Sequence, residues 1–167
     1  PGRRFPLLRS WTQDVPIMVC AGGGWNALGG GQRPNAIARE LVRLGHPTYY
    51  YSIGQMTGGI SGGVTVLSPK DLVDVTEILC QSPGVLFVGL PLYLDDLGPF
   101  IDAGWTLIYD MLDNWSGFVR TEGLDPRNVE LEEEIIRRAD VVTCSDPRLC
   151  DRAGEMGAPE TTLIRNG

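Results

Sequence analysis

The sequence is poor in several residue types that common functional sites require. It contains one lysine, Lys70, one histidine, His46, and four cysteines, with no Cys-x-x-Cys pair. A P-loop binds phosphates with a lysine that directly follows its glycines. The only lysine here is not next to a glycine-rich segment, so a P-loop is excluded. A zinc site is not expected, because zinc needs several clustered Cys or His ligands. Cys20, Cys80 and Cys144 lie in apolar runs, where we expect buried thiols of a reducing compartment.

Long apolar runs and an excess of basic charge are also absent. No stretch approaches the roughly 20 apolar residues of a membrane span, and none has the pattern of a cleaved signal peptide. The net charge is −7, from 14 basic and 21 acidic residues, which argues against nucleic acid as a partner. We therefore expect a cytoplasmic protein. Residues 1–14 are expected to form an N-terminal arm, through which a peripheral membrane contact is a further expectation. The arm mixes Arg3, Arg4 and Arg9 with Phe5, Leu7, Leu8 and Trp11.

Apolar runs of strand length alternate with amphipathic helical patterns from about residue 15 onward. This alternation predicts a parallel sheet with helices on both faces, and thus a single Rossmann-like, doubly wound α/β domain over residues 15–167. The first run is apolar throughout and is expected at the centre of the sheet, whereas the short third run is expected near an edge. The glycine-rich stretch 54–63 is expected to be a mobile loop. The expected strands are Pro16–Ala21, Pro47–Ile53, Val64–Leu67, Val85–Pro91, Thr106–Met111, Val141–Ser145 and Thr161–Ile164. The expected helices are Pro34–His46, Ser68–Ser82, Val129–Ala139 and Pro147–Gly157, and Leu94–Gly104 is expected to be a short helix or turn.

A glycine-rich segment joins the first expected strand to the first expected helix. It reads CAGGGWNALGGGQRP over Cys20–Pro34 and contains Gly22, Gly23, Gly24, Gly29, Gly30 and Gly31. Ligands of parallel sheets bind beyond the carboxyl ends of the strands, where backbone without side chains can approach a phosphate. The segment also matches the dinucleotide pattern G-x-G-x-x-A. That alternative is disfavoured for two reasons. In a dinucleotide fold the helix opens inside the motif and the next strand ends in an acid, whereas here the expected helix opens after the motif and the next expected strand has no acid.

Arg33 stands at the expected start of this helix, directly before Pro34. No Ser, Thr, Asp or Asn is present there to cap the first N–H groups. A phosphate could complete these groups while the Arg33 guanidinium forks onto its oxygens. Water over the helix end and a flexible loop are the structural alternative. For Arg33 itself, the alternative is a surface ion pair with a nearby acid.

Four stretches resemble the amino-terminal half of the GT-B glycosyltransferases. They are RPNAIARELVRLGHPTYYYS from Arg33, LIYDMLDNW from Leu107, LEEEIIRRADVVTCSDPRLCDRAGEMGAP from Leu131 and TTLIRNG from Thr161. The first two follow the family patterns R-P-x-x-[IL]-A-x-x-L-x-x-x-G-H and Y-D-x-x-D-x-[WF]. The third follows a helix–strand–helix pattern that begins at Glu132. The fourth is similar to the segment that links the two domains, with Arg165 in place of the usual proline.

The resemblance is best to retaining enzymes that use a nucleotide-sugar. It implies an acceptor-side domain for transfer of a sugar to a glycan, lipid-linked or small-molecule acceptor, with a carboxyl-terminal donor domain as its missing partner. It implies a donor or phosphate loop at Gly22–Gly24, Gly29–Gly31 and Arg33, and an inter-domain hinge at Asn166 and Gly167. Neither a metal nor a tightly bound cofactor is implied, no catalytic residue is assigned, and the chain alone is expected to be inactive.

Polar and aromatic residues lie at or just after the carboxyl ends of two successive expected strands: Asp110, Asp113, Asn114 and Trp115, and then Ser145. Carboxylates suit bidentate contacts with sugar diols, and exposed aromatic rings stack on sugar faces. We therefore expect acceptor or sugar contacts here, with helix caps, turn acids and a packed tryptophan as the structural alternatives. For the whole chain, the alternative function is a free-standing Rossmann-like module that binds a nucleotide or a sugar without catalysis.

Overall fold

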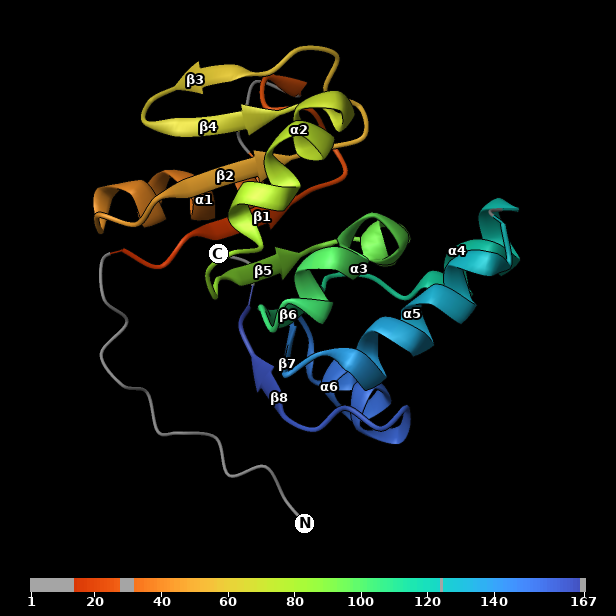
Figure 1. Ribbon diagram of the computed structural model, residues 1–167. Helices are drawn as coiled ribbons and strands as arrows, with labels where there is room; N and C mark the ends of the chain where they lie inside the picture. The colour runs from red at the N-terminus through yellow and green to blue at the C-terminus, as the bar shows by residue number, and fades with distance from the viewer. Residues whose placement is uncertain (1–13, 28–31, 124, 166–167) are drawn as a thin grey trace.

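The computed structural model describes residues 14–27, 32–123 and 125–165 of the chain. Within these residues, strands and helices alternate along the chain, as Figure 1 shows. The strands are β1 (Ile17–Cys20), β2 (Thr48–Tyr51), β3 (Gly59–Ser61), β4 (Val64–Leu67), β5 (Val85–Val88), β6 (Thr106–Met111), β7 (Val141–Cys144) and β8 (Thr161–Leu163). The helices are α1 (Arg33–Arg43), α2 (Pro69–Leu79), α3 (Leu94–Asp102), α4 (Trp115–Glu122), α5 (Arg127–Arg138) and α6 (Pro147–Glu155), with a 3₁₀ turn, η2 (Pro91–Tyr93), before α3.

The strands form one sheet in the order β3-β4-β2-β1-β5-β6-β7-β8. All neighbours are parallel except β3 and β4, which pair antiparallel. Ile17 at the start of β1 is in register with Thr48 on one side and Val85 on the other. The fold prediction is thereby confirmed, including the central position of β1. Strand β4 lies next to the edge, which β3 forms.

Side chains alternate between the two faces of the sheet and build two hydrophobic cores. Met18 and Cys20 of β1 face the larger core, which includes Leu97 of α3 and Ile135 of α5. Val19 of β1 faces the smaller core, beneath α1. Helices α2, α3, α5 and α6 therefore cover one face, and among the described residues α1 alone packs on the other.

Helix α1 begins at Arg33, one residue before the predicted start, because Gln32 is the extended N-cap residue. No side chain caps this helix start, in line with the absence of a capping side chain in the sequence. Helix α2 has the expected start, since Ser68 and Asp71 form a reciprocal capping box. None of the helices in the described residues is long and apolar enough to cross a membrane.

Two elements differ from the sequence-based prediction. The stretch 54–63 is not a simple loop, because it contains β3, and a two-residue turn with positive φ at Gly62 and Gly63 returns the chain into β4. Helix α4 was not predicted. It is capped by the Asn114 side chain and ends at Gly123 in the left-handed region, with φ 69°; both residues are ordinary helix-boundary signals.

Candidate functional site

A large cleft lies on the α1 side of the sheet and opens at the carboxyl ends of β1, β5 and β6. Its volume is about 1270 Å³. Gly22, Gly23 and Arg33 line the part of the cleft at the carboxyl ends of the strands, and Asp113 stands at its rim. Towards the amino ends of the strands the lining becomes apolar, and includes Ile17, Val85 and Ile108. The predicted glycine loop and strand-end acid thus meet at one cleft, where α/β sheets bind ligands.

The backbone after β1 is held in place by hydrogen bonds to buried and half-buried polar side chains. The Tyr50 hydroxyl donates to the Gly23 carbonyl oxygen at 2.7 Å, and the Asn35 amide donates to the Trp25 carbonyl oxygen at 2.9 Å. The Trp25 N–H donates to Gln55 Oε1 at 3.0 Å. Trp25 is buried, so it packs and does not offer its ring to the cleft. This part of the predicted donor loop is therefore a preorganised wall.

The chain's own side chains approach the first glycines of the loop. A Cβ added at Gly22 would lie 2.8 Å from Leu90 Cδ1, and one at Gly24 would lie 3.0 Å from Gln55 Oε1. At Gly23 the neighbour is Gln32 Oε1, at 3.3 Å. Internal packing thus accounts for part of the glycine run. Gly29, Gly30 and Gly31 lie outside the described residues, as do the hinge residues Asn166 and Gly167.

Arg33 binds an acid that lies 77 positions later in the sequence. Its Nη2 atom is 2.9 Å from Asp110 Oδ1, and its Nη1 atom donates to the Ile164 carbonyl oxygen at 2.9 Å. The Thr143 hydroxyl donates to the same Asp110 oxygen at 2.6 Å. The first residue of α1 is thereby tied to the ends of β6, β7 and β8. Arg33 therefore forms an ion pair, which was the alternative to a phosphate contact, but its partner is a buried acid and not one on the surface.

Burial governs the electrostatics of this pair. The side chain of Asp110 is 1% exposed and that of Arg33 is 18% exposed. Burial raises the pKa of Asp110, while the Thr143 hydrogen bond and the Arg33 guanidinium act in the opposite direction. Asp110 Oδ2 has no hydrogen-bond partner among the described residues. Asp110 therefore lies beneath the cleft surface, and among the described contacts its carboxylate is held by Arg33 and Thr143.

A second hollow, of about 540 Å³, lies between α4 and α6. Asp113, Asn114 and Ser145 line it, and Asp113 also lines the larger cleft. Asp113 and Asn114 are exposed, whereas the Ser145 hydroxyl donates to the Leu112 carbonyl oxygen at 3.0 Å. Three of the predicted sugar-contact residues thus gather at one place. Trp115 does not line either hollow; it is half-buried against Phe118.

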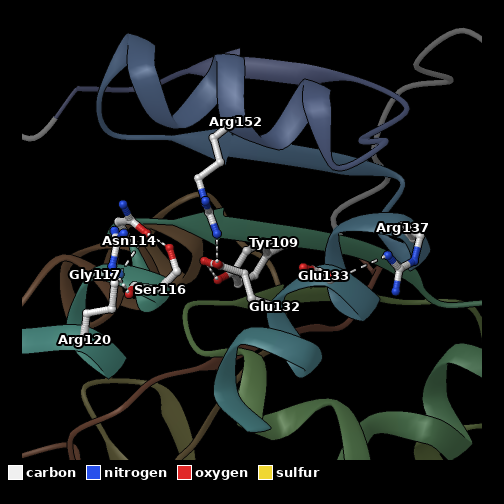
Figure 2. Close-up of polar contacts among 9 residues, drawn as sticks. All are labelled: Tyr109, Asn114, Ser116, Gly117, Arg120, Glu132, Glu133, Arg137 and Arg152. Atoms are coloured by element: carbon white, nitrogen blue, oxygen red, sulfur yellow. Dashed lines mark hydrogen bonds and ion pairs between the residues drawn. The ribbon is translucent and has the colours of Figure 1, made fainter. Parts of the chain in front are cut away.

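The wall of this hollow rests on a buried ion pair that sequence analysis did not identify. Figure 2 shows Arg152 reaching from α6 to Glu132 of α5, with Nη2 3.3 Å from Oε2. Glu132 is fully buried, and burial raises its pKa while Arg152 lowers it. The Tyr109 hydroxyl lies 3.5 Å from its other oxygen. Arg152 also lines the hollow.

Within the described ranges, no three His, Cys, Asp or Glu side chains gather so that they could hold a metal ion. The polar groups of the two hollows are carboxylates, amides, hydroxyls and arginines. Such groups bind hydroxyl-rich or anionic ligands through hydrogen bonds.

Comparisons with known proteins identify the fold. No protein-family model matches the sequence, and no curated protein matches it. Among solved structures, the chain is similar to the sucrose-phosphate synthase of Thermosynechococcus elongatus, with a TM-score of 0.66 and 12% sequence identity. The match covers 92% of this chain and 48% of that one, so this chain spans about half the length of the enzyme. The fold is therefore Rossmann-like, of the kind found in a glycosyltransferase.

Proposed function

We propose that this domain is the acceptor-side half of a glycosyltransferase that uses a nucleotide-sugar. The observation that carries the proposal is the pair of adjoining hollows at the carboxyl edge of the sheet, which share Asp113. Transfer of a group between two substrates requires that both are held next to one another in a reactive geometry, which two adjoining hollows allow. The fold similarity to a sucrose-phosphate synthase supports the same class of reaction.

In this proposal the larger cleft faces the donor, and Gly22, Gly23 and the start of α1 form its wall. The smaller hollow takes the acceptor, a glycan, lipid-linked sugar or small molecule, through Asp113, Asn114 and Ser145. Two neighbouring hydroxyl groups of the sugar would donate hydrogen bonds to the two oxygens of the Asp113 carboxylate. The donor phosphates would lie towards the uncapped N–H groups at the start of α1.

The missing partner in this proposal is a second domain that closes the larger cleft. The cleft is open, and its part towards the amino ends of the strands is lined by apolar side chains that include Ile108. A nucleotide-sugar bound to this half alone would keep its phosphates in water, where fixed dipoles stabilise little transition-state charge. This chain alone should therefore bind substrate weakly and transfer no sugar, with a retaining outcome expected for the complete enzyme.

Binding experiments with this chain test the assignment. We expect chemical-shift changes at the two hollows when UDP-glucose, ADP-glucose, GDP-mannose or free hexoses are titrated against labelled protein. Asp113→Asn should lower the affinity for whichever sugar binds by about tenfold or more, since a charged hydrogen bond contributes roughly 1.5–3 kcal/mol. Asp74→Asn is the matched control, because Asp74 is exposed on α2, on the opposite face.

The outcomes separate the two candidate functions. Weak binding of both a nucleotide-sugar and a sugar, with no turnover, supports the half-site of a transferase. Tight binding of one ligand by this chain alone supports the free-standing binding module instead. Equal affinities for the Asp113→Asn and Asp74→Asn variants would refute the role of Asp113.

A further inference from the structure

The open edge of the sheet at β3 has no electrostatic protection. Residues 44–69 contain no Asp, Glu, Lys or Arg, and this stretch spans β2, β3 and β4. Edge strands usually carry charges or proline, which prevent pairing with another chain. The opposite edge, β8, is flanked by Glu160 and Arg165. Figure 1 shows β3 as the outermost strand, with no described element beyond it.

The backbone of β3 presents free hydrogen-bonding groups to this edge. Gly62 and Gly63 form a two-residue turn, and Ser61 pairs with Val64 on either side of it. Such a turn is closed by a hydrogen-bonded pair, and hydrogen-bonded and open pairs then alternate along an antiparallel ladder. The next pair is Ile60 with Thr65. The Ile60 N–H and C=O groups therefore point away from β4, towards the open edge.

Apolar side chains accompany these free backbone groups. The side chain of Ile60 is 81% exposed, and that of Met56 in the preceding loop is 88% exposed. The strand is nevertheless anchored at its start, because the carboxylate of Asp71 on α2 accepts a hydrogen bond from the Gly58 backbone. A side chain at Gly58 would lie 2.9 Å from the Val66 carbonyl oxygen. Beyond the Asp71 carboxylate at its start, the edge is thus an anchored and uncharged strand that exposes Ile60.

We propose that β3 pairs antiparallel with β3 of a second copy of this chain, around a two-fold axis near Ile60. The chain carries a net charge of −7, so two copies repel one another at most approaches. They can meet without like-charge contacts along the uncharged edge. An antiparallel strand edge is complementary to itself under two-fold rotation, and this pairing uses up both β3 edges, so the assembly closes at two copies.

The interface is small, which sets the expected affinity. Strand β3 has three residues, so the pairing buries less than the roughly 1,200 Å² of a stable complex. We therefore expect a weak dimer, with a dissociation constant of about 100 µM or more, that forms only at high protein concentration. The β3 edge is separate from both hollows, so this inference is independent of the proposed transferase.

Sedimentation velocity from about 5 to about 500 µM protein, combined with amide exchange, tests the pairing. We expect a monomer–dimer equilibrium, in which the Ile60 amide exchanges rapidly in the monomer and becomes protected in the dimer. Ile60→Lys should weaken the dimer about tenfold or more, because two like charges then meet. Val73→Lys is the control, since Val73 is 75% exposed on α2, and it should leave dimerisation unchanged.

Three results would overturn the proposal. The first is a monomer at every concentration. The second is a dimer that survives Ile60→Lys, or that leaves the Ile60 amide unprotected. The third is open-ended aggregation in place of two copies. Circular dichroism of each variant confirms that Ile60→Lys, whose side chain points into solvent, still folds.

Discussion

Replacing Arg33 with alanine tests the central ion pair of the site. The change removes the guanidinium that lies 2.9 Å from Asp110 Oδ1 and leaves a carboxylate with the Thr143 hydroxyl as its remaining described donor. Loss of one partner of a buried pair typically costs about 3–5 kcal/mol. We expect the lower end, about 3 kcal/mol, because the 18% exposure of Arg33 lets water reach the vacated space. A surface ion pair would have contributed far less.

The loss should depend on pH in a defined direction. Burial holds the pKa of Asp110 above its ordinary value, and Arg33 opposes this rise, so its removal raises the pKa further. A carboxyl group with a raised folded-state pKa stabilises the fold fully below the unfolded pKa of about 3.9, and that stability is lost as the pH rises through the folded-state value. The difference between Arg33→Ala and wild type should therefore be largest near neutral pH and shrink towards about pH 4.

Urea denaturation at several pH values measures this difference. Arg43→Ala is the matched control on the same helix, because Arg43 pairs with Glu40 but its side chain is 69% exposed. That variant should lose little stability at any pH. Arg33→Ala/Asp110→Asn should recover most of the loss, since the buried charge is gone and the amide oxygen still accepts from Thr143. If Arg33→Ala and Arg43→Ala lose the same stability at pH 7, the reasoning is refuted.

Two further predictions concern packing around the site. Arg152→Ala should cost about 3 kcal/mol in urea unfolding, because it strands the fully buried Glu132. Arg137→Ala, which breaks an exposed ion pair with Glu133 within α5, should cost little, and equal losses would contradict the buried-pair account. Gly63→Ala should cost more than Gly62→Ala in the same assay, about 2 against about 1 kcal/mol. Both positions have positive φ, but only at Gly63 would a Cβ collide, 2.8 Å from a valine of α1; equal costs would contradict this.

The fold could be predicted because each strand and helix carries its own periodicity. The continuous apolar run of β1 predicted its central position, and Asp110 was placed correctly at the carboxyl end of β6. Helix α4 escaped prediction because its eight residues include Gly117 and none of them is buried, so no apolar face marks the helix. Strand β3 escaped because glycine-rich sequence is typical of loops.

The contacts of the site were less predictable because they join distant parts of the chain. The Arg33–Asp110 contact spans 77 positions, and Arg152–Glu132 joins two helices across a strand. No local pattern encodes which acid an arginine reaches. The glycine run was also ambiguous, because a glycine can leave room for a neighbouring side chain, such as the leucine next to Gly22, as well as for a ligand. Composition cannot separate these two causes.

Arg33 has a structural contact and a proposed ligand contact, and one pair of variants separates them. A phosphate at the start of α1 would compete with Asp110 and the Ile164 carbonyl oxygen for the guanidinium. Arg33→Ala would lower both stability and nucleotide-sugar affinity, so it alone cannot distinguish the two roles. In Arg33→Ala/Asp110→Asn the fold should be restored while the charge that meets the phosphate stays absent. If the double variant recovers its stability but binds the nucleotide-sugar of the proposed function about ten- to a hundredfold more weakly than wild type, Arg33 contacts the donor. If affinity returns with stability, Arg33 acts by holding the end of β6 in place.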